Sequence, residues 1–255
     1  MKIAALLSLV IALAGSGAVY SSHPGPDTLL ARESYDEALA FYRNLMDAGD
    51  NSYRTLYNAG AAAALAGEPG YGALYFYRAR RISDADASLE KNILAVQSAT
   101  GAQRYMAEPH SLVRILLFFY YGFSRSSLLL ILVAAGALLL VWFIIIHAFP
   151  AISRFTGRLV MLVLISVVCV SAVSFAVKQA EVHDSRRAVV VAPSAALYSE
   201  QSNPESLLFA IPAATMVRVV EEDYSLVKVE LSTGFSGWID SGVLEFVVRD
   251  YYEKD

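Results

Sequence analysis

Two long apolar segments in the middle of the sequence constrain its fold most strongly. They cover residues 128–148 and 159–177, and neither contains an Asp, Glu, Lys or Arg residue. A helix of about 20 such residues can cross the hydrocarbon layer of a membrane, and each Leu, Ile, Val or Phe near its centre favours insertion by about 0.3–0.6 kcal/mol. The short link between the segments contains Pro150 and Gly157, which disfavour a continuous helix. We therefore expect a transmembrane hairpin, with helices at residues 126–149 and 159–177 and a loop at residues 150–158.

The composition agrees with a membrane protein. Hydrophobic residues make up 56% of the chain and charged residues only 17%, whereas about a quarter of a typical soluble protein is charged. The net charge is −4 and both segments that flank the hairpin are acidic on balance, which argues against a nucleic-acid partner. The single cysteine, Cys169, lies inside the second apolar segment, so neither a disulfide framework nor a thiolate metal site is expected.

The N-terminus has the pattern of a secretory signal peptide. Met1 and Lys2 give a short positive start, residues 3–14 are apolar but too few to span a membrane, and residues 16–18 are small. The pattern predicts a signal peptide at residues 1–18 that is cleaved after Ala18. An uncleaved anchor is the alternative, and in both cases the following segment is exported.

Residues 27–104 show the periodicity of packed helices. The spacing of Tyr35, Ala38, Leu39 and Tyr42 places them on one helical face. Further helices are predicted at residues 56–67, 72–81 and 87–100, and a breaker lies at residues 49–52. Residue pairs recur at an offset of about 34 positions, the period of a tetratricopeptide repeat; the pairs are Ala38 with Gly72, Tyr42 with Phe76, and Leu45 with Ala79.

This segment resembles the tetratricopeptide repeat (TPR) family in the positions of its small and aromatic residues. The matching residues are Leu56, Ala59, Gly60, Ala63 and Gly67 in one helix and Gly72, Phe76 and Ala79 in the next. The resemblance implies an α-helical TPR-like domain of about one and a half repeats with a closing helix. It departs from the family where Gly72 replaces the usual Ala and Asp84 the usual Pro, and an unrelated helical bundle is the alternative. The candidate protein-binding residues of its groove are Tyr42, Tyr57, Asn58, Phe76 and Asn92.

Two further features of the sequence lie before the first apolar segment. Residues 112–123 are apolar and aromatic but too short to span, so a helix on the membrane surface is predicted at residues 110–125. Tyr120, Tyr121 and Phe123 stand where an interfacial aromatic belt would lie. In the helical segment, the basic cluster of Arg78, Arg80 and Arg81 is interpreted as a solvated helix face, with protein binding as the alternative.

The C-terminal segment changes to the two-residue period of short strands. In residues 226–231, Val227 and Val229 alternate with Lys228 and Glu230, and residues 232–234 form a hairpin turn signal. Similar short runs at regular spacing predict a small all-β barrel at residues 186–250. Five strands are expected, at residues 188–192, 207–211, 216–222, 226–231 and 237–239.

This β segment resembles the bacterial SH3 family. The likeness is carried by Ala192, Pro193, Leu197, Tyr198, Leu208, Thr215, Val217, Val219, Val227, Lys228, Val229, Gly234, Gly237, Trp238, Ile239 and Leu244. The resemblance implies an SH3-like barrel, but Leu226 stands where the family often has a Trp that lines its ligand groove. Trp238 is either a core residue that closes the barrel or a contact for a peptide or glycan. The candidate residues of the groove are Tyr198, Tyr224 and Trp238.

The order of these parts resembles the BatE family of the Bat (Bacteroides aerotolerance) operon. A signal peptide, TPR-like helices, a transmembrane hairpin and a terminal SH3-like barrel follow one another in the sequence. The resemblance implies a multidomain membrane protein in an envelope complex linked to stress tolerance. Its implied partners are membrane-anchored von Willebrand A-domain proteins, other Bat-type proteins and a MoxR-type ATPase.

The signal peptide determines the expected orientation. If it exports the helical segment, both soluble domains lie on the periplasmic side of a bacterial inner membrane and the link is cytoplasmic. The positive-inside rule favours a cytoplasmic link that carries Arg154 and Arg158. Arg114 and Arg125 lie on the opposite side, so the charge bias is weak and the signal carries most of the argument.

The sequence contains none of the motifs expected of an enzyme. It has no Gly-rich phosphate loop with Lys, no Gly-x-Ser-x-Gly and no His-Glu-x-x-His. Its four histidines, His23, His110, His147 and His183, are in separate segments without metal-ligand spacing. We therefore expect no catalytic residue, metal or cofactor. Two functions are consistent with the sequence: a membrane-tethered scaffold for partner proteins, or a sensor or anchor whose SH3-like domain binds peptidoglycan.

Overall fold

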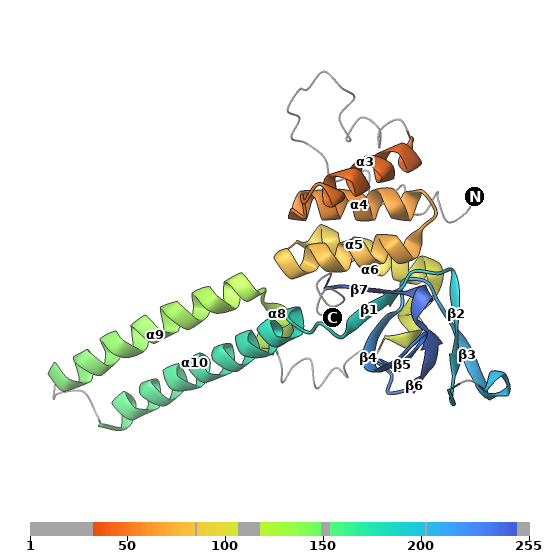
Figure 1. Ribbon diagram of the computed structural model, residues 1–255. Helices are drawn as coiled ribbons and strands as arrows, with labels where there is room; N and C mark the ends of the chain where they lie inside the picture. The colour runs from red at the N-terminus through yellow and green to blue at the C-terminus, as the bar shows by residue number, and fades with distance from the viewer. Residues whose placement is uncertain (1–32, 85, 107–117, 149–153, 202, 249–255) are drawn as a thin grey trace, which may run out of the picture. The chain divides into compact units, whose positions relative to one another are not determined.

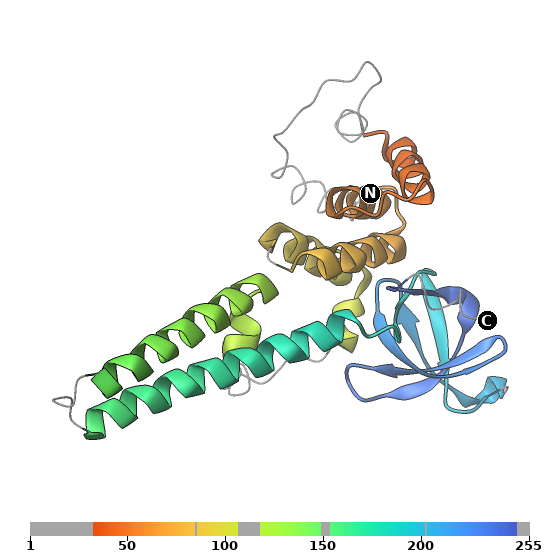
Figure 2. The same ribbon diagram turned by 60° about the vertical axis from the view of Figure 1, so that its left-hand side comes forward.

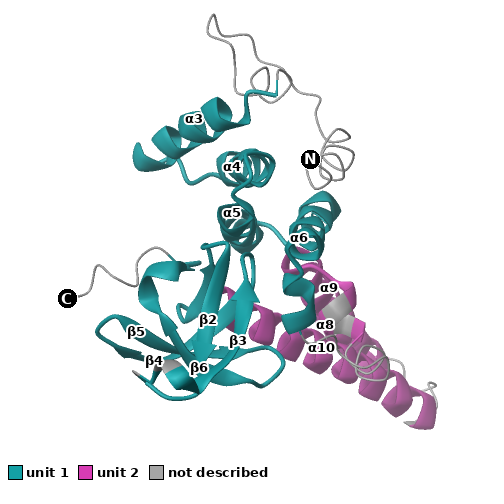
Figure 3. Cartoon of the chain, turned by 90° about the vertical axis from the view of Figure 1, so that its right-hand side faces the viewer, with its two compact units in different colours: residues 1–107, 185–255 teal, residues 108–184 magenta. Residues whose placement is uncertain are grey.

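The computed structural model describes residues 33–84, 86–106, 118–148, 154–201 and 203–248. The predicted signal peptide, half of the predicted surface helix at 110–125 and part of the predicted loop at 150–158 lie outside these residues. The chain divides into two compact units, unit 1 with residues 1–107 and 185–255 and unit 2 with residues 108–184 (Figures 1 and 3). Unit 1 is thus built from both ends of the sequence.

Helices form the N-terminal half of unit 1. They are α3 (Tyr35–Asp47), α4 (Tyr53–Leu65), α5 (Pro69–Ile82) and α6 (Ala87–Thr100), followed by the short 3-10 helix η1 (Ala102–Tyr105). Local signals set their ends: Ser52 caps α4 by accepting a hydrogen bond from the Thr55 N–H, Asp86 caps α6 through the Ser88 N–H, and Gly101 ends α6 at a φ of 81°. The three helices predicted at 56–67, 72–81 and 87–100 are therefore present with small shifts in their ends.

Small residues let α4 and α5 approach closely. A Cβ atom on Gly60 would lie 2.6 Å from the ring of Phe76, and one on Gly72 would lie 3.1 Å from Ala64. The aromatic side chain of Phe76 fills this space and is completely buried. The glycines that carried the sequence pattern therefore serve helix-on-helix packing.

The C-terminal half of unit 1 is an antiparallel sheet of seven strands in the order β3-β2-β6-β5-β4-β1-β7. The prediction of five strands was wrong, because it missed β2 and β7. β2 begins with the small residues Ser194, Ala195 and Ala196, which have weak strand preference, and β7 has only three residues. The strands are β1 (Arg187–Val190), β2 (Ser194–Tyr198), β3 (Leu207–Pro212), β4 (Met216–Asp223), β5 (Leu226–Leu231), β6 (Ser236–Asp240) and β7 (Leu244–Phe246), with 3-10 helices η2 (Pro204–Ser206) and η3 (Ser241–Val243).

Strand β1 joins the sheet to the helices. Ala188 and Val190 lie in the apolar interior of the curved sheet (Figure 2), whereas Val189 belongs to the core formed by the helices. At the next position, a Cβ atom on Gly70 of α5 would lie 2.5 Å from the Cα and carbonyl oxygen of Val191. The helices and the sheet therefore share a core within unit 1.

Unit 2 contains α8 (Phe118–Gly122), α9 (Arg125–Ala148) and α10 (Arg154–Val182). Helices α9 and α10 lie side by side (Figures 1 and 2), and both are long and apolar enough to span a membrane, with mean hydropathy of 3.1 and 2.8 over their apolar windows. The helix predicted at 159–177 extends further at both ends. Its extra residues, including Lys178 and Glu181, are good helix formers and continue the helix beyond its apolar part.

Polar contacts join the helices of unit 2 near both ends of α10. The Lys178 ammonium donates to the Phe123 carbonyl at 2.7 Å, and the Tyr120 hydroxyl donates to the Glu181 carboxylate at 2.5 Å. Near the other end, the Trp142 indole donates to the Gly157 carbonyl at 3.2 Å. Tyr120 and Phe123 were predicted at a membrane interface; here both lie beside the polar end of α10.

Candidate functional site

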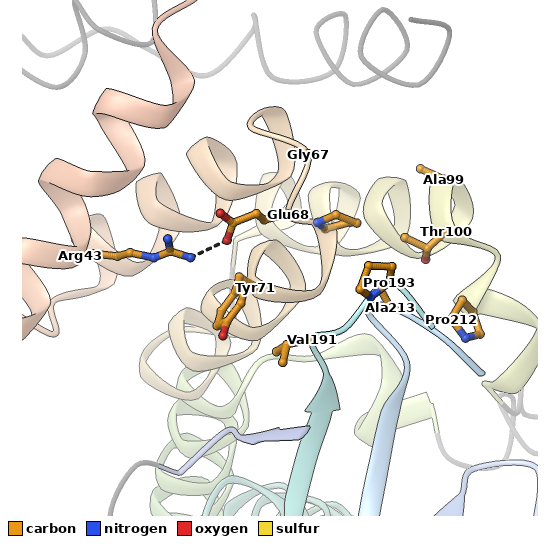
Figure 4. A pocket seen from close by; sticks show the side chains of 11 residues that line it. Arg43, Gly67, Glu68, Tyr71, Ala99, Thr100, Val191, Pro193, Pro212 and Ala213 are labelled. Carbon is orange, nitrogen blue, oxygen red and sulfur yellow. Dashed lines mark hydrogen bonds and ion pairs between the residues drawn. The ribbon is translucent and has the colours of Figure 1, made fainter. Parts of the chain in front are cut away.

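A crevice in unit 1, bordered by the helices and the sheet, is the candidate site (Figure 4). Its volume is about 650 Å³. The α4–α5 turn and α6 contribute to one wall, and the turns after β1 and β3 contribute to the other. The residues that line it are Arg43, Gly67, Glu68, Pro69, Tyr71, Ala99, Thr100, Val191, Pro193, Pro212 and Ala213.

An ion pair marks the polar end of the crevice. The Arg43 guanidinium lies 2.5 Å from the Glu68 carboxylate, and its Nε donates to the Tyr75 hydroxyl at 3.4 Å. The guanidinium carbon also lies 5.0 Å from the centre of the Tyr71 ring, a cation–π distance. Burial alone would lower the pKa of Arg43, but the hydrogen bonds to Tyr75 and Glu68 outweigh it and raise that pKa. Arg43 is therefore a fixed positive charge whose direction is set by its neighbours.

The apolar part of the crevice is rich in proline. Pro69 is at the start of α5, Pro193 follows β1, and Pro212 ends β3. Tyr71 stands between this part and the ion pair, and burial, with a smaller effect of Glu245, raises the pKa of its hydroxyl. The hydroxyl therefore stays protonated and can donate a hydrogen bond at neutral pH. Such a surface suits a neutral, extended segment of a partner protein rather than a charged small molecule.

Three of the five candidates for the TPR-like groove are core residues. Tyr42 and Phe76 are 2% and 0% exposed, and Asn92, at 3% exposed, donates a hydrogen bond to the Tyr57 hydroxyl at 2.9 Å. Tyr57 and Asn58 are partly exposed. Gly60 leaves room between α4 and α5 for the ring of Phe76, and Tyr42 and Asn92 are buried on α3 and α6. Tyr42, Phe76 and Asn92 therefore present no surface to a partner.

The candidates in the sheet are arranged differently. Tyr198 and Trp238 are register partners on β2 and β6, and both are partly exposed on the outer face of the sheet. Lys228 faces Trp238 from β5, with its ammonium 5.9 Å from the ring centre. Trp238 is thus not an interior core residue, since its neighbour Ile239 fills that position. Tyr224 is fully exposed in the turn between β4 and β5.

Sequence reasoning missed the crevice, although β1 contained a signal for it. Residues 188–191 are a continuous apolar run without alternation, which is typical of a strand that is covered on both faces. One covered face is the interior of the sheet, so the other had to be covered by the helices. The crevice lies at the margin of this shared core.

The crevice combines one ion pair with an apolar, proline-rich wall. Among the residues that the structure describes, no three His, Cys, Asp or Glu side chains are grouped so that they could hold a metal ion. The charged groups of the crevice, Arg43 and Glu68, pair with each other.

Comparisons with known proteins give no assignment: no family model, no curated protein and no solved structure matches this chain. The structure establishes helices and a seven-stranded antiparallel sheet in unit 1 and two apolar helices in unit 2. The function must therefore be inferred from the residues of the chain itself.

Proposed function

We propose that this chain is a non-enzymatic adaptor, tethered to the bacterial inner membrane by α9 and α10, whose exported unit 1 binds partner proteins. The observation that carries this proposal is the crevice, because it combines a proline-rich apolar wall with a single compensated ion pair. Such a surface can recognise a partner segment by shape and by the polar groups at one end. We therefore propose binding, rather than catalysis, as the role of the crevice.

The connectivity of unit 1 supports the membrane hairpin. Residues before α9 and residues after α10 belong to one compact unit, so both must lie on the same side of any membrane. An even number of crossings is then required between them, and α9 and α10 supply two. Interpreting the helices as TPR-like and the sheet as SH3-like fits this proposal, because unit 1 would then present two interaction modules on one tether.

The proposed partner is a membrane-anchored von Willebrand A-domain protein. The order of the parts resembles the BatE family, in which such proteins, other Bat-type proteins and a MoxR-type ATPase are the implied partners of an aerotolerance complex. A partner anchored in the same membrane would be confined near unit 1, which raises its effective concentration.

A site-specific crosslinking experiment tests this proposal in native membranes. A photoreactive amino acid is introduced at Ala99, which is exposed in the crevice, and at Asn51, an exposed control position outside it. We expect a single adduct from position 99 that mass spectrometry identifies as a von Willebrand A-domain protein, and none from position 51. Recovery of the chain without an adduct at position 99 would contradict the proposal.

Binding to peptidoglycan is the second candidate function, and one observation favours it. Tyr198, Trp238 and Lys228 form a partly exposed aromatic and cationic platform, and sugar rings or stem peptides could lie on such a surface. Because the sheet shares its core with the helices, the test uses the full chain in detergent and purified cell-wall material. The adaptor proposal predicts that the chain stays in the supernatant; sedimentation that is lost in Trp238→Ala would instead favour wall binding.

A further inference from the structure

The sheet-side wall of the crevice limits which hydrogen bonds a ligand can form there. In the part of this wall that the structure describes, the lining residues are Val191, Pro193, Pro212 and Ala213 (Figure 4). The two prolines have no N–H group. The Val191 N–H donates to the Val243 carbonyl at 2.9 Å, and the N–H of Ala213 is also engaged, by the Pro193 carbonyl at 3.2 Å. A segment that lies against this wall must therefore bring its own donors.

The end of α6 adds acceptors on the helix side of the crevice. Ala99 and Thr100 line the crevice, and α6 ends at Thr100 with Gly101 as its C-cap. The last carbonyl groups of a helix have no donor within that helix, and they form the negative end of its dipole. This end of the crevice therefore also favours a ligand that donates hydrogen bonds or carries positive charge.

An exposed carboxylate, Glu245 of β7, borders the polar end of the crevice. Glu245 is the register partner of Val189 in β1, and directly opposite residues of an antiparallel pair share one face of a sheet. Because Val189 packs in the core formed by the helices, Glu245 lies on the side of the sheet that faces them. Burial raises the pKa of Tyr71 most, and the Glu245 carboxylate is the next cause. The carboxylate is therefore close to the Tyr71 hydroxyl, which belongs to the crevice.

The charge of Glu245 is not compensated by an ion pair. The Arg43 guanidinium pairs with Glu68, and the Arg78 guanidinium donates to the neutral carbonyl of Phe246 at 2.8 Å. Among the described residues, the Glu245 carboxylate has neither a salt bridge nor a hydrogen bond. An anionic ligand would have to displace Glu68 from Arg43 and would then face Glu245, whereas a cationic ligand meets a carboxylate that is ready to pair.

We propose that the crevice selects partner segments that carry a lysine or arginine side chain, which pairs with Glu245 at the polar end. This inference rests on the proposed adaptor function and adds a rule of selection to it. The neutral residues of the segment lie along the apolar wall, and its main-chain N–H groups donate to the carbonyl groups at the end of α6. A segment of the same shape with an acidic side chain at this position is repelled, so charge decides between segments that fit equally well.

The photoreactive amino acid at position 99 of the full chain, in native membranes, also tests this selection. The yield of the adduct is compared between the parent chain, Glu245→Lys and a matched control, Glu222→Lys, which reverses an exposed carboxylate on β4 outside the crevice. We expect Glu245→Lys to lower the yield by about tenfold, because an attraction becomes a repulsion. Glu222→Lys should leave the yield unchanged.

A charge exchange separates a lost ion pair from a misfolded variant. The basic residue nearest the crosslink in the captured segment is changed to Glu, which should lower the yield with the parent chain and restore most of it with Glu245→Lys. An unchanged yield in Glu245→Lys, an equal loss in both variants, or no restoration by the exchange would overturn the charge selection, while the adduct of the parent chain would still support the adaptor proposal. The absence of an adduct from the parent chain would overturn both proposals.

Discussion

Gly70 is the residue on which the joint between the helices and the sheet depends most directly. A Cβ atom there would meet backbone atoms of Val191 at 2.5 Å, and backbone cannot move aside as a flexible side chain can. We therefore expect Gly70→Ala to destabilise unit 1 by about 2–3 kcal/mol, as overpacking of a core does. Urea unfolding in detergent, followed by the fluorescence of Trp238 in a Trp142→Phe background, measures this loss.

The control for this prediction is another glycine. A Cβ atom on Gly136 of α9 has no neighbour within 4 Å, so Gly136→Ala should leave the unfolding midpoint of unit 1 unchanged. Equal midpoints for the Gly70 variant and the parent chain would mean that the helices and the sheet do not meet as described.

Tyr77 makes the stability of unit 1 fall with rising pH in the alkaline range. Burial, partly opposed by Arg80, raises the pKa of Tyr77 to about 12, above the value of about 10 for an exposed phenol. The folded state favours the protonated phenol. The stabilisation that Tyr77 gives to the folded state is therefore complete below about pH 10 and is lost as the pH rises toward about 12. The free energy of unfolding should therefore fall across this range.

The Tyr77→Phe variant separates this effect from other titrations. It should be less stable at about pH 8, by roughly 1–2 kcal/mol, because the buried Gln97 amide that donates to the Tyr77 hydroxyl loses this acceptor. The difference from the parent chain should shrink at about pH 11, where the parent loses its phenol contribution. A difference that stays constant with pH would contradict the assignment to Tyr77.

At the residue scale, sequence reasoning found the right positions for helix packing but also assigned Tyr42, Phe76 and Asn92 to a binding groove, whereas the structure buries them. Gly60 and Phe76 were recognised from their spacing, and the structure shows that one makes room for the other. Whether an aromatic residue faces a groove or a core depends on which helix covers it, and a single sequence does not contain that information. Tyr42 and Asn92 were misplaced for the same reason.

At the element scale, a hydrogen bond joins the start of α6 to α4. The Tyr53 hydroxyl donates to the Asp86 carboxylate at 2.5 Å, while the same carboxylate accepts the Ser88 N–H at 2.7 Å. The hydrogen bond from Tyr53 holds the pKa of Asp86 below its usual range; burial opposes this effect in part, and hydrogen bonds from the backbone N–H groups of Ser88 and Leu89 add to it. The folded state favours the charged carboxylate. The stabilisation that Asp86 gives to the folded state is therefore present above about pH 4 and is lost as the pH falls.

A double-mutant cycle measures this link between helices. We expect Asp86→Ala to cost about 1–2 kcal/mol through the lost helix cap, and Tyr53→Phe with Asp86→Ala to show a coupling energy of about 1 kcal/mol at neutral pH. The coupling should decrease as the pH falls through the lowered pKa of Asp86, where the carboxylate becomes protonated. Additive effects at neutral pH would show that the two side chains do not interact.

The sequence predicted long periodic elements better than short ones. The apolar helices and α4–α6 were placed with small errors at their ends, since each repeats its pattern over several turns. β2 and β7 were missed because three to five residues with small or mixed side chains carry too little pattern. These strands exist because neighbouring strands supply hydrogen bonds, as when β7 pairs with β1 from Ala188 to Val190, and such pairing is not encoded locally.

At the scale of the whole molecule, the union of two distant segments into unit 1 is the finding that the order of parts did not predict. Two independent modules on either side of a hairpin were expected. Instead, Val189 and Val247 of the sheet share a core with the helices, so the segments cannot be treated as separate domains. The modules would then move, bind and unfold together.

The side of the membrane on which unit 1 lies depends on two signals in the sequence that oppose each other. The predicted N-terminal signal sequence favours export of unit 1, whereas the positive-inside rule counts basic residues near the ends of the predicted spans. More of them lie on the side of unit 1 than in the link. On the side of unit 1 they are Arg114, Arg125, Lys178, Arg186 and Arg187, and in the link they are Arg154 and Arg158.

We expect the first hydrophobic segment to dominate and unit 1 to be exported. Single cysteines at Asn51, Phe155 and Tyr224 in a Cys169→Ala background report this when intact cells are treated with a membrane-impermeant maleimide. Positions 51 and 224 are exposed in the two halves of unit 1, and Phe155 is 78% exposed at the start of α10. Positions 51 and 224 should react in intact cells, and position 155 only after permeabilisation. Reaction of position 155 alone would reverse the orientation but keep unit 1 intact. Different results for positions 51 and 224 would show that α9 and α10 do not both cross, since one compact unit cannot lie on two sides of a membrane.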